Sequence, residues 1–341
     1  MRRMERAGSL ATRLRGRTEV AWLAVIALAA LMAHTAPGSA QDYPSKPIRI
    51  IAGAAPGGLI DLFARTFAAK LQERSGQPVL VENNSVATGT IGADLVVKSP
   101  PDGYTLLLGH TASMVILPIL NPHLPYDPGK DLAPIALVGE AANLLLVRRE
   151  SPANSVQELI ALAKAKPGTW TYASQGLGSS AHMATEQFRL AAGLELIHVP
   201  YRGSTPAVTD LMSGQVAMMI DTVPFNLGHI RAGSLRALAV AAPKRAPVLP
   251  DVPTMAEAGL PGVEGGLWLA LFAPAHAPPS VVAYLNKEAR EIFALPDVRD
   301  RLETRGLALP VGSPEDLSAY LAAEKARWSD VVQRAGIKLP Q

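Results

Sequence analysis

The stretch IRIIAGAAPGGLIDLFAR, residues 48–65, predicts a buried strand that runs into a glycine-rich turn and then into a helix. The apolar residues up to Ala52 are of strand length. Apolar side chains from Ile60 to Leu71 then recur at helical spacing, and Gly76 is a typical helix stop. Between strand and helix, Gly57 and Gly58 would leave backbone N–H groups exposed at a helix N-terminus, a position that suits an anion.

The first 40 residues have the order of a secretory signal peptide. Six arginines precede an apolar core at 20–33, and small residues follow up to Ala40, where we expect cleavage. A membrane anchor is the alternative, but an apolar run of about 14 residues is short for the roughly 20 that a spanning helix needs. The sequence therefore predicts export of a mature chain that begins near Gln41.

Removal of this leader changes the charge of the chain. The whole sequence has 32 basic and 29 acidic residues, and the leader carries six arginines and two glutamates. The 26 basic and 27 acidic residues that remain give no basic stripe for nucleic acid. The chain has no cysteine, so it forms no disulfide and carries no lipid on an N-terminal cysteine. We expect an untethered periplasmic monomer with an ordinary packed core.

Apolar runs of strand length alternate with amphipathic helical segments almost to the end of the chain. The strand candidates are PIRIIAG, PVLVEN, GYTLLLGH, ANLLLVRR, WTYASQG, ELIHVPY, QVAMMID, LRALAV and LWLALFAP. Alternation of this kind predicts an α/β fold in which mainly parallel sheets are flanked by helices. We expect two interleaved lobes, with residues 43–144 and 268–341 in the first and 145–267 in the second.

Familiar catalytic motifs are absent from the sequence. Gly53 and Gly58 have the spacing of a Walker loop, but Leu59 and Ile60 follow where Lys and Ser or Thr would bind phosphate and magnesium. No Gly-x-Gly-x-x-Gly follows the first strand, and GLGSSAH at 176–182 lacks the last glycine of a nucleophile elbow.

His182 and Glu186 are one helical turn apart and could share a metal ion. A solvated or capping pair is the better interpretation, because no further metal-binding pattern accompanies them. We therefore expect no catalysis, no metal and no cofactor.

Four glycine- or hydroxyl-rich turns each follow a strand candidate, at 54–61, 88–93, 109–113 and 174–182. Because parallel strands end at one edge of a sheet, such turns should border a crevice outside that edge. They offer N–H and O–H donors with almost no fixed positive charge, which predicts a carboxylate held by neutral donors and helix dipoles. A single glycine pair after a strand is often only a tight connection, so the prediction depends on all four turns.

Across essentially the whole mature chain, the sequence resembles the substrate-binding proteins of tripartite tricarboxylate transporters, the Bug family. The segments that carry the resemblance are YPSKPIRIIAGAAPGGLIDLFAR, GQPVLVEN, TIGADLVVKSPPDGYTLLLG, LPYDPGKDLAPI, YASQGLGSSAHMATEQF, HVPYRGSTPAVTDLMSGQV and IRAGSLRALAVAAPKRAPVLPDVPTMAEAGLPG. The resemblance implies a type II-like periplasmic binding protein with two α/β lobes and a ligand cleft between them. Family members typically deliver small carboxylates to membrane transporter subunits, and some serve a sensor kinase instead.

The resemblance also implies the site residues, motif by motif. The first lobe would contribute Pro56, Gly57, Gly58, Thr88, Gly89, Thr90, Ile91, Gly92, Ala93, His110, Thr111 and Ser113. The second lobe would contribute Ser174, Gly178, Ser179, His182, Tyr201, Gly203, Ser204, Thr205 and Asp221. Asp61 joins the set in a capping or orienting role, because an unpaired carboxylate there would repel an anion. A helix cap is the alternative role for Ser204 or Thr205.

Three departures from the family pattern bear on the ligand. Leu59 and Ile60 replace the usual glycine and hydroxyl residue, NSVA at 84–87 replaces Arg-Pro-Gly-Ala, and apolar residues at 114–117 follow the third turn. These changes favour a carboxylate less polar than citrate. We predict a solute-binding protein, and the alternative is an exported α/β enzyme that uses His182 or Asp221 as an acid–base group.

Overall fold

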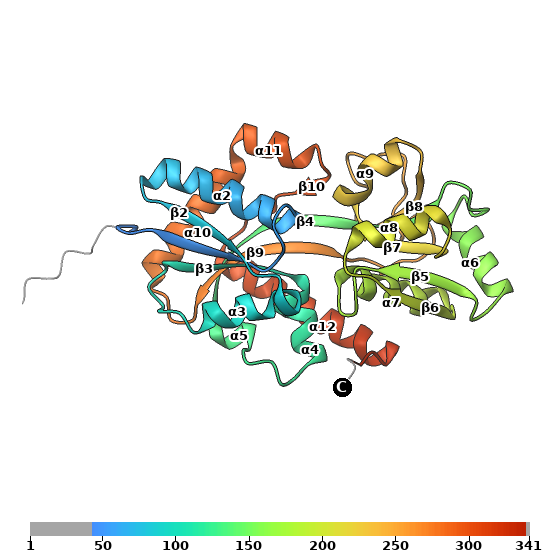
Figure 1. The fold of residues 1–341 in the computed structure, drawn as a ribbon, viewed down its shortest axis with the longest axis horizontal. Coiled ribbons are helices and arrows are strands. Elements are labelled where there is room, and N and C mark those ends of the chain that lie inside the picture. The colour runs from blue at the N-terminus through green and yellow to red at the C-terminus, as the bar shows by residue number, and fades with distance from the viewer. Residues whose placement is uncertain (1–42, 339–341) are drawn as a thin grey trace, which may run out of the picture. The chain divides into compact units, whose positions relative to one another are not determined.

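The strand–turn–helix unit predicted at residues 48–65 opens the fold (Figure 1). We describe residues 43–338 of a computed structural model. Strand β1 (Ile48–Ala52) leads into helix α2 (Leu59–Ser75), and Gly76 caps the end of that helix by donating its N–H to the Gln72 carbonyl oxygen. The helix forms here because its apolar stripe is buried: Phe63, Phe67 and Leu71 are inaccessible or nearly so.

By its contacts the chain divides into two units, Met1–Ser45 and Lys46–Gln341. The helices and strands of the described residues all lie in the second unit. The predicted signal peptide at 1–40 lies outside the described residues. Among residues 43–338, no helix combines the length and the apolar character needed to cross a membrane.

The strands of this unit form one mixed sheet in the order β2-β1-β3-β9-β4-β7-β5-β6, with β8 and β10 also paired to β4. The further strands are β2 (Val79–Asn83), β3 (Thr105–His110), β4 (Leu132–Arg148), β5 (Trp170–Ser174), β6 (Leu196–Pro200), β7 (Met218–Thr222), β8 (Leu235–Ala241), β9 (Gly266–Pro274) and β10 (Leu307–Ala308). We call β2, β1, β3, β9 and β10 the first half of the sheet, and β7, β5, β6 and β8 the second half. Strand β4 runs through both.

Parallel pairing occurs in the outer part of each half, where β1 lies between β2 and β3, and β5 lies between β6 and β7. Strands β4 and β9 pair with their neighbours in the antiparallel sense. The sheet is therefore mixed, whereas the alternation of strands and helices predicted mainly parallel sheets. Every strand candidate named above overlaps a strand of the structure. The predicted lobe boundary at 144/145 falls within β4, which runs through both halves, and the boundary at 267/268 falls at the start of β9, where the chain returns to the first half.

The remaining helical segments cover both faces of the sheet. They are η1 (Val86–Gly89), α3 (Thr90–Val97), η2 (Ala112–Ile116), α4 (Leu117–Leu120), α5 (Pro128–Asp131), α6 (Val156–Ala165), α7 (Ser180–Ala192), α8 (Ser204–Ser213), α9 (Val223–Arg231), α10 (Pro279–Ala294), α11 (Pro296–Glu303) and α12 (Pro314–Ala335). In the first half, α2 and α10 cover one face, while α3 and α12 cover the other. In the second half, α8 and α9 lie opposite α6 and α7.

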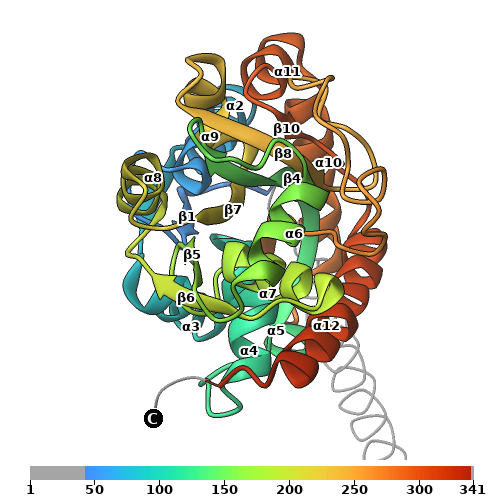
Figure 2. The ribbon, with the colours of Figure 1, turned by 90° about the vertical axis from the view of Figure 1, so that its right-hand side faces the viewer.

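Helix α12 belongs by its core to the first half, yet it also packs against α7 of the second half (Figure 2). Its buried Trp328 shares an apolar cluster with Trp268 of β9 and Met183 of α7. The Glu324 carboxylate accepts a hydrogen bond at 3.0 Å from the indole N–H of each tryptophan. This packing fixes the side of the sheet on which α7 begins, and α7 carries several of the predicted site residues.

Candidate functional site

Three turns of the first half meet at the carboxyl edge of β1, β2 and β3. Ala52, the last residue of β1, is level with Asn83 of β2 and Leu108 of β3. The turns after these strands are therefore neighbours. Gly89 shows how closely they approach, because its φ is 83° and a Cβ atom there would lie 2.5 Å from the Gly53 carbonyl oxygen. Only glycine satisfies both conditions.

The first turn contains exposed Pro56 and Gly57 and leads to α2 through Gly58. The Gly57 N–H donates to the buried Asp61 carboxylate at 2.9 Å, and Arg65 forms an ion pair with the same carboxylate. Burial alone would raise the pKa of Asp61, but hydrogen bonds from Arg65, from Gly57 and from a β2 asparagine together lower it. The negative charge of Asp61 is thus balanced by Arg65, one helical turn further along α2. The first N–H groups of α2 have no side-chain cap.

The second turn has a strained backbone. Ala87 and Thr88 have φ values of 48° and 57°, a conformation that non-glycine residues adopt rarely and that clusters at functional sites. The Thr90 hydroxyl donates to the Ala87 carbonyl oxygen at 2.9 Å. Ile91 is 45% exposed, whereas Gly92 and Ala93 are buried where α3 packs against the sheet. Thr88 is therefore the exposed hydroxyl of this turn, and Gly92 and Ala93 lie beneath it as packing residues.

The third turn follows β3 and holds three buried residues, His110, Thr111 and Ser113. Burial lowers the pKa of His110 to about 4, although the neighbouring backbone of Gly53 and Thr88 favours the protonated form. Its Nε2 atom has no hydrogen-bond partner within residues 43–338. The imidazole is therefore neutral at pH 7 and has an uncommitted polar atom at the edge where the turns meet.

The two hydroxyls of the third turn are already hydrogen-bonded to the fold. Thr111 Oγ1 accepts a bond from the Trp268 N–H at 2.9 Å. Ser113 Oγ donates to the His110 carbonyl oxygen at 3.3 Å, and the Ser113 carbonyl oxygen accepts from the Tyr126 hydroxyl at 2.7 Å. These residues fix the course of the chain after β3 rather than presenting free donors.

The turn after β5 has a similar internal network. Ser174 Oγ lies 2.6 Å from His198 Nε2 and accepts a hydrogen bond from the Gly176 N–H at 3.1 Å. Ser179 caps helix α7 by accepting from the His182 N–H at 3.2 Å. Burial and the neighbouring His198 lower the pKa of His182 to about 3, and His182 Nδ1 accepts from the Gly178 N–H at 3.3 Å.

Of the two interpretations of His182 and Glu186, a solvated pair is wrong, whereas His182 does cap the start of α7 through its bond from the Gly178 N–H. Both side chains are buried. His182 stacks on His198 with ring centroids 4.3 Å apart, and His198 stacks in turn on Tyr172 at 4.7 Å. The Tyr172 hydroxyl donates to Glu186 at 2.6 Å, and Arg189 pairs with that carboxylate. The sequence could not reveal this column because β5, β6 and α7 contribute to it from separate parts of the chain.

Asp221 lies at the end of β7 and is fully buried. The Gln175 amide donates both to Asp221 and to the Ser204 hydroxyl. These two hydrogen bonds connect the turns after β5, β6 and β7. Burial raises the pKa of Asp221, while hydrogen bonds from Ser204, Thr222, Asn226 and Gln175 favour the charged form. Asp221 Oδ2 has no hydrogen-bond partner in the described part of the chain.

Helix α8 begins after Gly203 without a side-chain cap, so the alternative capping role for Ser204 or Thr205 is wrong. Thr205 is exposed. The Tyr201 hydroxyl donates to Asp210 at 2.6 Å, and burial together with this bond raises its pKa to about 12. Tyr201 is therefore bound within its own half.

The turns of the two halves approach each other at Gly178. A Cβ atom there would lie 3.0 Å from Leu117 Cδ2 and 3.4 Å from Leu120 Cδ1, both in α4. Helix α4 follows η2, which begins directly after Thr111. The loop between β5 and α7 is thus next to the segment that continues the third turn.

Asn143 is a candidate that the sequence interpretation missed. It is fully buried in β4, level with Thr222 of β7. Both polar side-chain atoms of Asn143, and the Thr222 hydroxyl, have no hydrogen-bond partner among residues 43–338. An unsatisfied buried polar group lowers stability by about 1–3 kcal/mol, and a hydrogen bond to a ligand or an ordered water would offset that cost. These atoms are therefore available to either. A lone amide in the apolar run ANLLLV, residues 142–147, was the signal for it.

The arrangement suits recognition of a small anion. Helices α2, α3 and α8 all begin without a side-chain cap at the carboxyl edges of their halves, so their first N–H groups and dipoles remain available. Arg65 is bound to Asp61, and the predicted site residues include no lysine or arginine. Within the described residues, no group of three His, Asp or Glu side chains could hold a metal ion.

Comparison with known proteins places this geometry in a family. The model described as the tripartite tricarboxylate transporter family receptor matches residues 63–337. The chain belongs to this family. The resemblance to Bug proteins is thereby confirmed: BugT of Bordetella pertussis (strain Tohama I) is 40% identical over 305 residues, which cover 89% of this chain and 94% of BugT.

Solved structures of the family share the fold. Rpa4515 of R. palustris, solved with adipate, is 36% identical with a TM-score of 0.80, and the match covers 87% of this chain and 99% of that protein. MatC (Rpa3494) from Rhodopseudomonas palustris, with bound malate, is 35% identical with a TM-score of 0.76, over 85% of this chain and all of MatC. The predicted fold class, a two-lobed α/β periplasmic binding protein, is confirmed.

Proposed function

We propose that this receptor is a periplasmic solute-binding protein that holds a small organic carboxylate between the two halves and delivers it to a tripartite tricarboxylate-type membrane transporter. The observation that carries the proposal is the set of uncapped helix starts and neutral polar groups at the carboxyl edges of both halves, with Gly178 of one beside α4 of the other. Helix dipoles and N–H groups can neutralise a carboxylate without a fixed cation.

The ligand that fits best has two carboxylates separated by an apolar chain. Leu59 and Ile60, at the start of α2, are both less than one-tenth exposed and make that end of the site apolar. Citrate would bring a third carboxylate and a hydroxyl to this apolar end, at a desolvation cost. That Rpa4515, a relative of similar fold, was solved with adipate supports the same class of ligand.

Calorimetry with adipate, malate, benzoate and citrate tests the proposal. We expect saturable binding with adipate ahead of citrate, and Ile60→Thr should narrow that difference. Proton NMR of each compound after prolonged incubation with the protein should show it unchanged. Turnover of any of them would favour an enzyme instead, and a clear preference for citrate in the wild type would refute the apolar site.

A further inference from the structure

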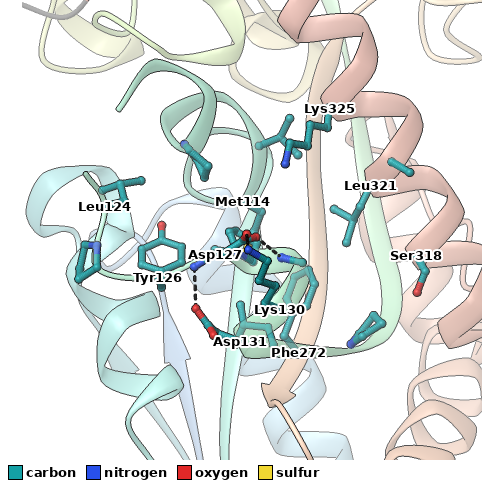
Figure 3. A pocket seen from close by; sticks show the side chains of 18 of the residues that line it. Met114, Leu124, Tyr126, Asp127, Lys130, Asp131, Phe272, Ser318, Leu321 and Lys325 are labelled. Carbon is teal, nitrogen blue, oxygen red and sulfur yellow. Dashed lines mark hydrogen bonds and ion pairs between the residues drawn. The ribbon is translucent and has the colours of Figure 1, made fainter. Parts of the chain in front are cut away.

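A cavity of about 670 Å³ lies beside η2 (Figure 3). The chain between η2 and β4 forms one wall, and α12 forms the opposite wall. Its volume is within the range of small-molecule sites, which is roughly 300–1,000 Å³. None of the predicted site residues lines it, so it is separate from the carboxylate site proposed above.

The floor of this cavity is apolar. Met114 and Val115 of η2, Leu132 of β4 and Phe272 of β9 are buried beneath it, and Leu321 of α12 borders it. In Figure 3, Met114, Phe272 and Leu321 lie around the hollow. A ligand here would need an apolar body that covers this floor.

The charged side chains of the cavity differ in whether they already have partners. Asp127 caps α5 by accepting the Gly129 N–H at 2.9 Å, and its carboxylate also pairs with Lys130. Asp131 accepts the Asp127 N–H at 2.7 Å. Lys325 of α12 reaches toward the hollow and forms no ion pair within residues 43–338. Asp131 likewise forms no ion pair within residues 43–338, but it lies on the α5 side of the cavity, whereas Lys325 lies on α12. The uncommitted charge on the α12 wall is therefore positive.

We propose that this cavity is a second binding site, for an organic anion with an apolar tail, such as a medium-chain carboxylate. The Lys325 ammonium would pair with the carboxylate, while the tail would cover Met114, Phe272 and Leu321. A neutral molecule of the same size would lose the ion pair, and a small polar anion would leave the floor exposed to water. An amphipathic anion satisfies both features.

Such a ligand would contact the chain that supports the third turn. Met114 packs so closely on β3 that a Cβ atom at Gly109 would lie 2.8 Å from its Cγ atom. Tyr126, which also lines the cavity, donates its hydroxyl to the Ser113 carbonyl oxygen. Occupation of the cavity should therefore alter the affinity of the carboxylate site, and by linkage the reverse. This coupling rests on the proposed function, whereas the second site itself does not.

Octanoate and 1-octanol are suitable probes, with carbon-13 methyl NMR of the methionines as the readout. Met114 reports on the cavity, and its signal can be assigned with Met114→Leu; Met255, buried in the second half, is the internal control. We expect a saturable octanoate shift at Met114 and weaker binding of 1-octanol. Equal affinities for octanoate and 1-octanol would refute the role of charge.

Two variants locate the site, and two act as controls. Lys325→Met should weaken octanoate binding about tenfold, in line with loss of one charged hydrogen bond. Ala322→Trp, on the exposed side of α12, should fill the cavity and abolish the Met114 shift. Lys244→Met removes an exposed lysine that follows β8 in the second half, and it should leave both the octanoate affinity and the Met114 shift unchanged. Gly58→Val, which blocks the carboxylate site, should leave the Met114 shift intact.

The outcomes separate the two proposals. Unchanged octanoate affinity in both Lys325→Met and Ala322→Trp, or loss of binding only in Gly58→Val, would overturn the second site. Absence of adipate binding with an intact Met114 response would refute the ligand of the proposed function alone. An adipate affinity that is the same with and without saturating octanoate would overturn the coupling.

Discussion

At the scale of single residues, contacts between glycines hold the first-half turns together. Gly89 approaches Gly53 so closely that no side chain fits between them, and His110 lies against the same backbone. The starts of α2 and α3 are thereby held at one edge, each without a side-chain cap. For ligand affinity, access to the backbone N–H groups at these helix starts should consequently matter more than the charge of nearby side chains.

Gly58→Val tests that access. Gly58 has a φ of −80°, and an added Cβ atom would have only the Ala55 carbonyl oxygen nearby, at 3.6 Å, so valine needs no glycine-only conformation. We expect the fold to persist and adipate affinity to fall at least tenfold, about 1.4 kcal/mol, in calorimetry. Gly228→Val, at an exposed helix position with open space, is the matched control. Normal binding by Gly58→Val would show that the anion is held elsewhere.

His110 should make stability depend on pH. Its pKa is lowered by burial from 6.5 to about 4, so the unfolded chain binds more protons between these values. The contribution of neutral His110 to the free energy of unfolding is therefore complete above about pH 6.5. It falls by on the order of 3 kcal/mol as the pH decreases toward 4. Urea unfolding of wild type and His110→Gln between pH 4.5 and 8 should show a flatter profile for the variant. His123→Gln, at an exposed histidine, should retain the wild-type slope.

The site was only partly predictable because a sequence does not say where a hydroxyl points. Thr111, Ser113, Ser174 and Tyr201 have the right chemistry for donors, yet their hydroxyls bond to the backbone or to side chains of their own half. The apolar run around Asn143 indicates a buried strand, but which groups lie beside its amide depends on the partners of β4, which the local sequence does not specify.

At the scale of elements, β4 shows why boundaries are harder to predict than strands. Its end, from residue 142 onward, matches the candidate ANLLLVRR, but the strand begins earlier, at Leu132, and continues through Pro134 and Gly139, which are typical strand breakers. The register with β9 shifts next to both residues, so they form irregularities within a continuous strand. Gly139 is needed because a Cβ atom there would lie 2.4 Å from the Phe63 ring.

Helix α7 offers a prediction at this scale. Ser179→Ala removes the cap at its first turn and should lower the free energy of unfolding by about 1 kcal/mol. Because that turn also holds Gly178 beside α4, adipate affinity should fall as well. Ser155→Ala removes the equivalent cap of α6, which contributes no predicted site residue, and should reduce stability without affecting binding. Equal losses of adipate affinity in the two variants would contradict a specific role of the α7 turn, because lower stability alone would then explain the loss.

For the whole molecule, the proposed function requires that a ligand favour one arrangement of the halves over another. Small-angle scattering should show a smaller radius of gyration at saturating adipate than without ligand. Gly58→Val measured under the same conditions should show no change, because it should not bind. An unchanged radius in the wild type, despite binding seen by calorimetry, would contradict closure.

Strand order also bears on how the chain can be made. Strand β9 lies between β3 and β4, although it is synthesised more than a hundred residues after both have begun. A growing polypeptide on the ribosome therefore cannot complete the centre of its sheet until residues 266–274 have emerged. The contacts between residues far apart in the sequence consequently form last. Such a delay would suit the export predicted from residues 1–40. A chain cut short before Gly266 would instead present two open strand edges, and we expect it to aggregate.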